Sequence, residues 1–352
     1  MEVILVLGAR PQFIKAAPVA AALTAAGIKV RILHTGQHYD HGMSGAYFEE
    51  LAIPVPAWNL GCGGGTQGAM TGAMLTEIEQ VLMEQKPDMT VVFGDTNSTL
   101  AGALAAAKLH IPVAHVEAGL RSGNRRMPEE LNRICTDHLS ELLFCSSEAG
   151  RTQLAAEGIT RGVYVTGDVM ADVFYAALEN AKSHHRPVVP FVLLTLHRAE
   201  NTEDTEHLRT IFAAVEQSKM RVIFPVHPRT RKLLQGSGMA VPANLECREP
   251  CGYMEMVALL SACEFVMTDS GGLQKEAYWA GKSCITLRTE TEWTELVESG
   301  WNEVAGTDTV TILNNMHSPP RPDDGTHPEF YGDGRASSRV AAAVQDFLAA
   351  TP

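Results

Sequence analysis

Three carboxylates are marked out by their local sequence: Asp95 in GDTNSTLAGALAA, Glu117 in HVEAGLRS and Glu129 in MPEELNR. Asp95 and Glu117 each follow an apolar run typical of a strand. We therefore expect both to lie at the carboxyl edge of a parallel sheet, where open α/β sheets bind ligands. Their neighbours are Gly, Asn, His and Arg and not a solvated run of charge, which favours a site. Several acids in one site are suited to proton transfer.

Two histidines in the second half also follow strand-like runs. His197 and Arg198 lie in TLHRAEN, and His227 and Arg229 lie in PVHPRT. A lone histidine is more often structural than catalytic, and that alternative stands for each one taken singly. Two strand-end His-Arg clusters in neighbouring units nevertheless favour a site, because histidine is the side chain whose charge changes near neutral pH.

The segment TDSGGLQKEA, residues 268–277, has the features of a phosphate site. A strand-like run ends there, and Ser270, Gly271 and Gly272 come before a helical pattern. Such a turn presents backbone N–H groups and the positive end of the helix dipole to an anion. Glu276 lies further inside the helix, where a carboxylate is suited to accept both hydroxyls of a ribose. The alternative is that the two glycines serve only close helix packing.

A cationic helix start follows the first apolar run, in GARPQFIKAAP. Arg10 stands at the expected amino terminus with Lys15 further along, so cations and free N–H groups would meet an anion there. The alternative is an arginine that bridges domains. The segment is not a GxGxxG fingerprint, which argues against nicotinamide binding. The glycine-rich segment LGCGGGTQGAM, residues 60–70, lacks the lysine of a P-loop, so a ligand loop and a plain connector both stand.

The elements that must hold these residues follow an α/β pattern. Apolar runs of strand length alternate with helical segments: EVILVL, KVRILHT, MTVVF, IPVAHV and LLFCSS, then FVLLTL, MRVIFPV, CEFVMT and KSCITL. This alternation predicts parallel sheets with helices on both faces. A change of composition over residues 165–188 predicts two domains, 1–168 and 169–334. Residues 335–352 are expected to form a terminal helix that packs back on the first domain.

The totals narrow the class of protein. The chain has 352 residues, 45% of them hydrophobic, and its 41 acidic and 28 basic residues give a net charge of −13. That charge disfavours nucleic acid and anionic membranes as partners. The first residues lack a basic segment and a cleavage pattern, and no apolar stretch reaches the length of a membrane span, so we expect a cytoplasmic protein. The seven cysteines form no CxxC pair, which disfavours disulfides and zinc.

The motifs taken together resemble those of the non-hydrolysing UDP-N-acetylglucosamine 2-epimerases. GARPQFIKAAP, GDTNSTLAGALAA, HVEAGLRS, PEELNR, TLHRAEN and DSGGLQKEA occur in this order over roughly residues 3 to 300. The resemblance implies two Rossmann-like domains in a glycosyltransferase-B arrangement, with the active site in the cleft between them and the UDP moiety on the C-terminal domain. It also implies a UDP-sugar substrate, a homodimer, a role in polysaccharide biosynthesis, and neither a cofactor nor a metal.

By this resemblance the site residues acquire roles. Asp95, Glu117 and Glu129 match the catalytic acids and His197 matches the catalytic histidine. The positions that match nucleotide contacts are Arg10, Lys15, Arg133, His227, Ser270, Gly271, Gly272 and Glu276, and the segment around Tyr253 matches the uracil pocket. The implied reaction eliminates UDP to give a 2-acetamidoglucal and then adds it back, with the proton delivered to the other face of C2.

Three alternatives follow from the same residues. The basic loop LRSGNRRMPEE resembles that of relatives acting on UDP-2,3-diacetamido-2,3-dideoxyglucuronate, so Arg125 or Arg126 would contact the substrate carboxylate; a solvated basic loop is the other interpretation.

HTGQHYDHGM stands where substrate-regulated bacterial members carry a QHR pattern, which argues against their allosteric site. A glycosyltransferase of the same fold and a non-catalytic UDP-sugar sensor are the remaining readings.

Overall fold

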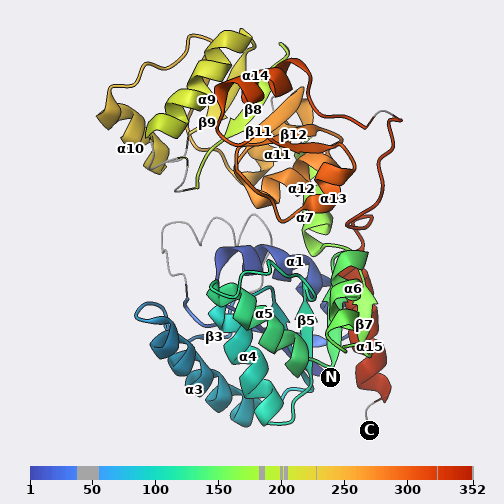
Figure 1. The fold of residues 1–352 in the computed structure, drawn as a ribbon. Coiled ribbons are helices and arrows are strands. Elements are labelled where there is room, and N and C mark those ends of the chain that lie inside the picture. Colours follow the sequence, from blue (N-terminus) through green and yellow to red (C-terminus); the bar gives the residue numbers. More distant parts are fainter. Residues whose placement is uncertain are drawn as a thin grey trace. The chain divides into compact units, whose positions relative to one another are not determined.

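The computed structural model describes residues 1–37, 55–181, 187–198, 201, 205–226, 228–322 and 324–350. The chain divides into two compact units (Figure 1). Unit 1 consists of residues 1–173 and 329–352, and unit 2 consists of residues 174–328. The chain first passes from unit 1 to unit 2 after Val173, within helix α7 (Val169–Ala181). The boundary expected from composition, after residue 168, directly precedes this helix.

Unit 1 contains a seven-stranded parallel sheet in the order β3-β2-β1-β4-β5-β6-β7. The strands are β1 (Glu2–Leu7), β2 (Lys29–His34), β3 (Trp58–Asn59), β4 (Met89–Phe93), β5 (Val113–Val116), β6 (Leu142–Cys145) and β7 (Val163–Val165). The order reverses between β1 and β4, which are direct neighbours. Such a switch point opens a crevice at the carboxyl ends of the strands.

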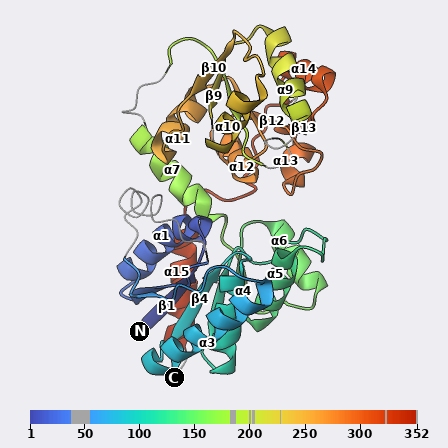
Figure 2. The same ribbon diagram turned by 90° about the vertical axis from the view of Figure 1, so that its left-hand side faces the viewer.

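Helices cover both faces of this sheet (Figure 2). They are α1 (Arg10–Ala25), α3 (Gln67–Gln85), α4 (Asn97–Lys108), α5 (Pro128–Leu139), α6 (Glu148–Ala156) and α15 (Ala336–Ala350). Val3, Leu5 and Leu7 of β1 pack with α1 and α15, whereas Ile4 and Val6 pack with α3 and α4. Because alternate residues face opposite layers and both layers are dry, this strand is a continuous apolar run.

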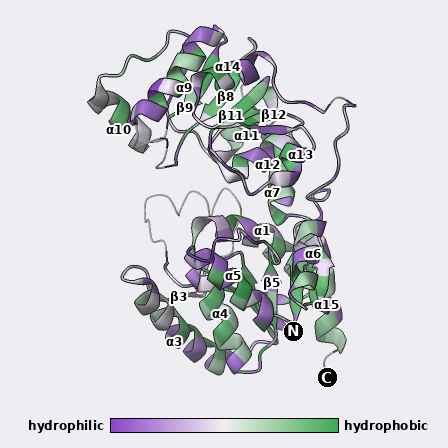
Figure 3. Cartoon of the chain, in the orientation of Figure 1, coloured by the Kyte–Doolittle hydropathy of each residue, from purple (hydrophilic) through white to green (hydrophobic). Residues whose placement is uncertain are grey.

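Close packing on the second face depends on small side chains in α4. The helix is largely hydrophobic (Figure 3) and buries a series of alanines against the sheet. A Cβ at Gly102 would lie 3.1 Å from the Cβ of Val6. Thr96 caps the helix by accepting the N–H of Thr99 at 3.3 Å. The turn that carries Asp95 therefore ends at a defined helix start.

Unit 2 contains a six-stranded parallel sheet in the order β10-β9-β8-β11-β12-β13. Its strands are β8 (Val192–Thr195), β9 (Val222–Pro225), β10 (Leu245–Arg248), β11 (Phe265–Thr268), β12 (Ser283–Thr286) and β13 (Asn302–Val304). Its further helices are α9 (Thr205–Ser218), α10 (Pro228–Ser237), α11 (Tyr253–Ala262), α12 (Gly271–Trp279), α13 (Thr294–Glu298) and α14 (Thr309–His317). The order reverses between β8 and β11.

The α/β class with two Rossmann-like domains is confirmed. All nine strand-length runs identified in the sequence are strands. The terminal segment forms α15, whose Val340 and Val344 are fully buried in the core of unit 1. Within the described residues no helix has the length and apolar character that crossing a bilayer requires.

Candidate functional site

Asp95 lies in the turn between β4 and α4, at the switch point of the first sheet. Its carboxylate forms an ion pair with Arg133 of α5. Its backbone carbonyl accepts a hydrogen bond from Nδ2 of Asn132 at 2.9 Å. Arg133 also binds Oε2 of Glu130 at 2.9 Å. The turn after β4 is thus fastened to α5 through both its backbone and its acid.

Glu117 follows β5 and has a φ of 71°, in the left-handed region that residues other than glycine rarely adopt. Holding a non-glycine residue there costs about 1–3 kcal/mol and is most often seen at functional sites. The carboxylate accepts a hydrogen bond from the ammonium of Lys15 in α1, and both side chains are 14% exposed. This strained turn therefore aims a carboxylate at the start of α1.

The charge of Lys15 is maintained by several acids. Burial alone would lower its pKa, but the charges of Glu117, Asp168 and Asp95 raise it above the ordinary value. At neutral pH the ammonium is therefore protonated. Lys15 is thus bonded to the acid that follows β5 and also feels the charge of the acid that follows β4.

Asp168 is an acid that the sequence did not single out. It is 2% exposed, and its Oδ1 accepts the N–H of Met170 at 2.8 Å at the start of α7. Its own N–H donates to the carbonyl of Tyr331 at 2.8 Å. The only sequence signal at Asp168 was the change of composition over residues 165–188, which indicated a domain boundary and not a charge near Lys15.

The two adjacent glutamates at the start of α5 have different surroundings. Glu130 is 2% exposed and accepts the N–H and Oγ of Ser122 at 2.9 and 3.0 Å and the N–H of Gly123 at 2.9 Å. Burial opposes its charge, but these bonds and Arg133 hold its pKa below the ordinary value. Glu129 is partly exposed, and none of the described residues forms an ion pair or hydrogen bond with its side chain. Glu130 shapes the loop, whereas Glu129 is available to a ligand.

The arginines of the basic loop divide in the same way. Arg121 is engaged internally, by Oδ2 of Asp137 at 2.7 Å and by both oxygens of Glu157 at 2.8 and 2.7 Å. Arg125 and Arg126 are exposed, and no ion pair or hydrogen bond to their guanidinium groups is formed by the described part of the chain. Only these two arginines of the loop are available to a substrate.

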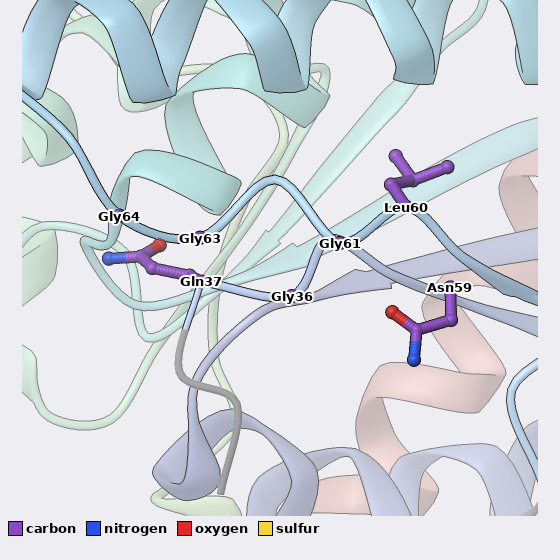
Figure 4. A pocket seen from close by; sticks show the side chains of 7 residues that line it. All are labelled: Gly36, Gln37, Asn59, Leu60, Gly61, Gly63 and Gly64. Atoms are coloured by element: carbon purple, nitrogen blue, oxygen red, sulfur yellow. The ribbon is translucent and has the colours of Figure 1, made fainter.

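The glycine-rich segment lines a pocket of about 600 Å³ beside the ends of β2 and β3 (Figure 4). Its lining residues are Gly36, Gln37, Asn59, Leu60, Gly61, Gly63 and Gly64. The backbones approach so closely that a Cβ at Gly63 would lie 2.3 Å from the carbonyl of Gly36. Oε1 of Gln37 accepts a hydrogen bond from Oγ of Ser98 at 2.7 Å, joining this wall to α4. A ligand role for the segment stays a prediction.

In unit 2, His197 follows β8 and faces Asp269, which follows the neighbouring β11. Nδ1 of His197 is 2.9 Å from Oδ1 of Asp269, and the imidazole is 47% exposed. Asp269 is fully buried and also accepts the N–H groups of His197 and Arg198 and the Nδ2 of Asn201, each at 3.1 Å. Burial opposes its charge, but these partners hold its pKa below the ordinary value. Sequence reasoning missed Asp269, which orients the histidine.

The residues of the predicted phosphate turn lie at the start of α12. Ser270 caps the helix by accepting the N–H of Leu273 at 3.3 Å. A Cβ at Gly271 would lie 2.5 Å from Oε1 of Glu292, the end of a flexible and partly exposed side chain that would have to turn away. A Cβ at Gly272 would meet only Oγ of Ser270, at 3.9 Å. The surroundings within the described residues are therefore crowded at Gly271 and open at Gly272.

Tyr253 and Glu276 are brought together from two helices. Tyr253, the first residue of α11, donates its hydroxyl to Oε1 of Glu276 in α12 at 3.0 Å. Burial and the nearby negative charge raise the pKa of the Tyr253 phenol. A ring and a carboxylate at the carboxyl edge of this sheet form a surface suited to a base and a ribose.

For two of the expected site residues the structure describes no side-chain contacts. His227 lies outside the described residues, and the structure describes Arg10 only as the first residue of α1. Apart from these, one group in unit 1 comprises Lys15, Asp95, Glu117, Glu129 and Arg133, and one group in unit 2 comprises His197, Tyr253, Ser270, Gly271, Gly272 and Glu276. The group in unit 1 consists mainly of acids, whereas half of the group in unit 2 forms the amino terminus of α12.

The chain is similar to known proteins over nearly its whole length. The profile of the family UDP-N-acetylglucosamine 2-epimerase matches residues 21–345. A UDP-N-acetylglucosamine 2-epimerase homolog of Methanococcus maripaludis is 44% identical over 98% of this chain and 100% of its own length. The UDP-2,3-diacetamido-2,3-dideoxy-D-glucuronate 2-epimerase of Pseudomonas aeruginosa is 45% identical over 97% of this chain and 98% of its own.

A solved structure extends the likeness to three dimensions. The UDP-GlcNAc 2-epimerase of Methanocaldococcus jannaschii, in complex with UDP-GlcNAc and UDP, is 40% identical with a TM-score of 0.85. The match covers 98% of this chain and 100% of that one. The profile, the relatives and the fold agree over nearly the full length. The chain therefore belongs to the UDP-N-acetylglucosamine 2-epimerase family.

Proposed function

We propose that this protein interconverts UDP-N-acetylglucosamine and UDP-N-acetylmannosamine. The observation that carries the proposal is the group of acids and cations in unit 1, in a chain that belongs to this family. Lys15 binds Glu117 and Arg133 binds Asp95, so two carboxylates from different strands are fixed beside the switch point of the sheet. An epimerase needs such fixed acid/base groups, whereas transfer of a sugar to an acceptor does not require a proton to change faces.

The chemistry explains why more than one acid is required. The proton at C2 of the sugar is not adjacent to a carbonyl, so its removal must accompany departure of UDP from C1. The product, a 2-acetamidoglucal, then takes UDP back while C2 receives a proton on the opposite face. Groups on two faces are needed, which one residue cannot supply. Asp95, Glu117 and Glu129 are the proposed acids, and the assignment of each to a face stays open.

Unit 2 is proposed to bind the UDP that departs and returns. The amino terminus of α12, with Ser270 and the open Gly272, would receive the diphosphate, because unpaired N–H groups and the helix dipole stabilise negative charge. Tyr253 and Glu276 would receive the uracil and the ribose. His197, oriented by Asp269, is proposed to act on the charge that develops at the departing phosphate.

The deciding experiment is proton NMR of the enzyme with UDP-N-acetylglucosamine in D2O, without added cofactor or acceptor. Deuterium at C2 together with a UDP-N-acetylmannosamine signal is the expected result. Asp95→Asn and Glu117→Gln should slow exchange by about 100-fold or more, the usual contribution of a positioned acid or base. An active enzyme whose variants exchange at the wild-type rate would remove these acids from the mechanism.

A second substrate is favoured by one specific observation. Arg125 and Arg126 are exposed and uncommitted within the described residues, and the Pseudomonas aeruginosa relative is named for a uronic-acid sugar nucleotide. A substrate carboxylate would be a matching partner for a guanidinium. On this alternative, UDP-2,3-diacetamido-2,3-dideoxyglucuronate is epimerised at C2.

The two substrates are separated by replacing both loop arginines with methionine. If the uronate is the substrate, kcat/KM for the acidic sugar should fall by about 10-fold or more, while that for the neutral sugar stays within about twofold. Arg161→Met, at another exposed loop arginine of unit 1, is the matched control. An unchanged ratio between acidic and neutral sugars would discard the carboxylate contact.

Homodimer formation and a cytoplasmic location also remain predictions. Light scattering after gel filtration tests the first, with a mass near twice 38.0 kDa expected. Fractionation of cells that express the full chain tests the second, with the protein expected in the fraction free of membranes.

A further inference from the structure

A buried hydrogen-bond chain lies behind the acids of unit 1. His115 of β5 and Asp137 of α5 are 0% and 1% exposed. Nδ1 of His115 lies 2.7 Å from Oδ1 of Asp137, and Nε2 lies 2.7 Å from the carbonyl oxygen of Gly94. Gly94 directly precedes Asp95. One imidazole therefore spans from the turn that carries Asp95 to helix α5.

The second oxygen of Asp137 holds the turn that carries Glu117. Oδ2 accepts the N–H of Gly119 at 3.2 Å and binds Nη1 of Arg121 at 2.7 Å. Gly119 lies two residues after Glu117, and both have positive φ, 79° and 71°. The guanidinium is fixed in turn by Glu157. Asp137 is therefore bound directly to the segment that carries Glu117, and it reaches the turn that carries Asp95 through His115.

The donors and acceptors define where the hydrogens lie. The carbonyl of Gly94 can only accept, so Nε2 of His115 donates. Burial opposes a charge on Asp137, but the hydrogen bonds and charges of His115 and Arg121 hold the pKa of this carboxyl below its ordinary value. An ionised carboxylate also only accepts, so Nδ1 donates as well. Both nitrogens of the His115 ring therefore donate a hydrogen bond.

Asp137 also has a fixed relation to the working face of α5. It follows Arg133 by four residues and Glu129 by eight, which places all three along one face of the helix. Arg133 from this face binds Asp95. The His115–Asp137 bond therefore ties α5 to β5, and the Arg133–Asp95 pair ties the same helix to the turn after β4.

We propose that His115, protonated on both nitrogens, is a positioning residue that fixes the Asp95 turn, the Glu117 turn and α5 relative to one another. The inference rests on the proposed function, because it assumes that these acids act on the sugar. A buried ion pair is weak evidence for stability, since well-packed apolar residues often replace one without loss. Geometric specification of three acid-bearing segments gives this pair a role that apolar packing would not provide.

The hydrogen positions are tested on the wild-type protein. Histidine labelled with 15N would be observed by long-range correlation spectra at pH 7, with His115 assigned from the spectrum of His115→Gln. Both ring nitrogens of His115 are expected to carry a hydrogen, as their two hydrogen bonds require. An unprotonated ring nitrogen at neutral pH would overturn the proposal. This measurement needs no substrate.

The positioning role is tested by kinetics against a matched control. His115→Gln and Asp137→Asn should lower kcat for C2 exchange on the order of 100-fold, the cost of displacing reacting groups by about 1 Å. UDP affinity, measured by calorimetry, should fall much less than kcat, because the proposed contacts at Tyr253, Glu276 and the start of α12 belong to unit 2. Of the nucleotide contacts expected in unit 1, only Arg133 lies on α5. The control is Asp172→Asn, whose carboxylate accepts the N–H groups of Ala336 and Ser337 at 2.9 and 2.8 Å and contacts none of the acids.

The control separates positioning from folding. Asp172→Asn should lose a similar amount of thermal stability and keep kcat within about twofold. If kcat of the His115 and Asp137 variants falls no further than that of the control at equal loss of Tm, the role is merely structural and the proposal fails. A wild-type enzyme that exchanges no proton with either substrate would overturn the proposed function and this role together. An active wild type matched by His115→Gln would overturn the role alone.

Discussion

Glu117 adopts a backbone conformation that L residues avoid, with a φ of 71°, and its carboxylate binds Lys15. The strain and the ion pair oppose each other in the folded state. Burying Lys15 requires the carboxylate, because an unpaired buried charge costs several kcal/mol. The carboxylate reaches Lys15 from a turn that costs about 1–3 kcal/mol to hold. The strained backbone at Glu117 therefore accompanies a carboxylate that is held in one place by Lys15.

Comparing Glu117→Gly with Glu117→Ala isolates this strain. Both changes remove the carboxylate and leave Lys15 without its direct partner, but only glycine adopts the positive φ freely. Glycine also gains entropy in the unfolded chain, which offsets part of its advantage. We expect the glycine variant to be more stable than the alanine variant by about 1 kcal/mol, measured by urea unfolding, with proton exchange lost in both. An alanine variant of equal or greater stability would show that the turn is not strained.

At the residue scale, the sequence predicted the acids but not the groups that orient them. Asp95 and Glu117 follow strand-length apolar runs, and that position is visible in a single sequence. Asp168, Asp269 and His115 also follow or lie within strands, yet each acts through a partner far along the chain. His115 is 22 residues from Asp137, and His197 is 72 residues from Asp269. No local pattern specifies such a pairing.

At the scale of elements, buried strands were predictable and edge strands were not. The nine strands identified from the sequence are the nine that have a neighbour on each side in their sheet. The missed strands are β3, β7, β10 and β13, which are the four edges. An edge strand is short and partly exposed, so VYV or LECR lacks the continuous apolar run that a strand covered on both faces needs.

The start of α12 offers a test of the predicted diphosphate site. A Cβ at Gly272 would have no close neighbour within the described structure, and alanine is a better helix former than glycine by about 1 kcal/mol. Gly272→Ala should therefore keep or raise the melting temperature. The added methyl would occupy the space assigned to phosphate, so we expect UDP affinity, measured by calorimetry, to fall about 10-fold or more.

Gly271→Ala provides the contrast to this variant. Its Cβ would lie 2.5 Å from Oε1 of Glu292, so the carboxylate must turn away from its place beside Arg288, and the melting temperature should fall slightly and not rise. Unchanged UDP affinity in a stable Gly272→Ala protein would remove this helix start from the phosphate site.

The stability that Glu130 gives to the loop before α5 should depend on pH. Its pKa is held below the ordinary value, so between the two values the unfolded chain binds more protons than the folded one. Stability therefore rises with pH across that interval. The contribution is complete above the unfolded pKa of about 4.3 and is lost as the pH falls through the lower, folded pKa.

Glu130→Gln measures this contribution directly. The amide keeps one acceptor oxygen and turns a donor toward the N–H of either Ser122 or Gly123, so the variant should lose about 1–3 kcal/mol at pH 7. The difference from wild type in urea-induced unfolding should shrink as the pH drops below about 4.3. A difference that stays constant down to the lowest pH at which the protein folds would show that the charge of Glu130 is not its source.

At the scale of the whole molecule, the chain visits unit 2 and returns to complete unit 1. Residues 329–352 belong to unit 1, and α15 packs beside α1 on one face of the first sheet. Val340 and Val344 are fully buried there with Val3, Leu5 and Leu7 of β1. The core under Lys15 and Asp95 therefore contains residues from both ends of the chain. Asp172 at the first crossing accepts the N–H groups that begin α15, which ties the outgoing and returning segments together.

Ending the chain at residue 334 should therefore damage the units unequally. Removing α15 exposes the apolar face formed by α1 and β1, and loss of several buried side chains costs more than the typical stability of a domain provides. Hydrogen exchange followed by mass spectrometry should show β1 and β4 unprotected in the shortened chain, while β8 and β11 stay protected. A chain ending at residue 350, which keeps α15, is the control. If β1 and β4 remain as protected in the shortened chain as in the control, the last helix is not part of the core that positions the acids.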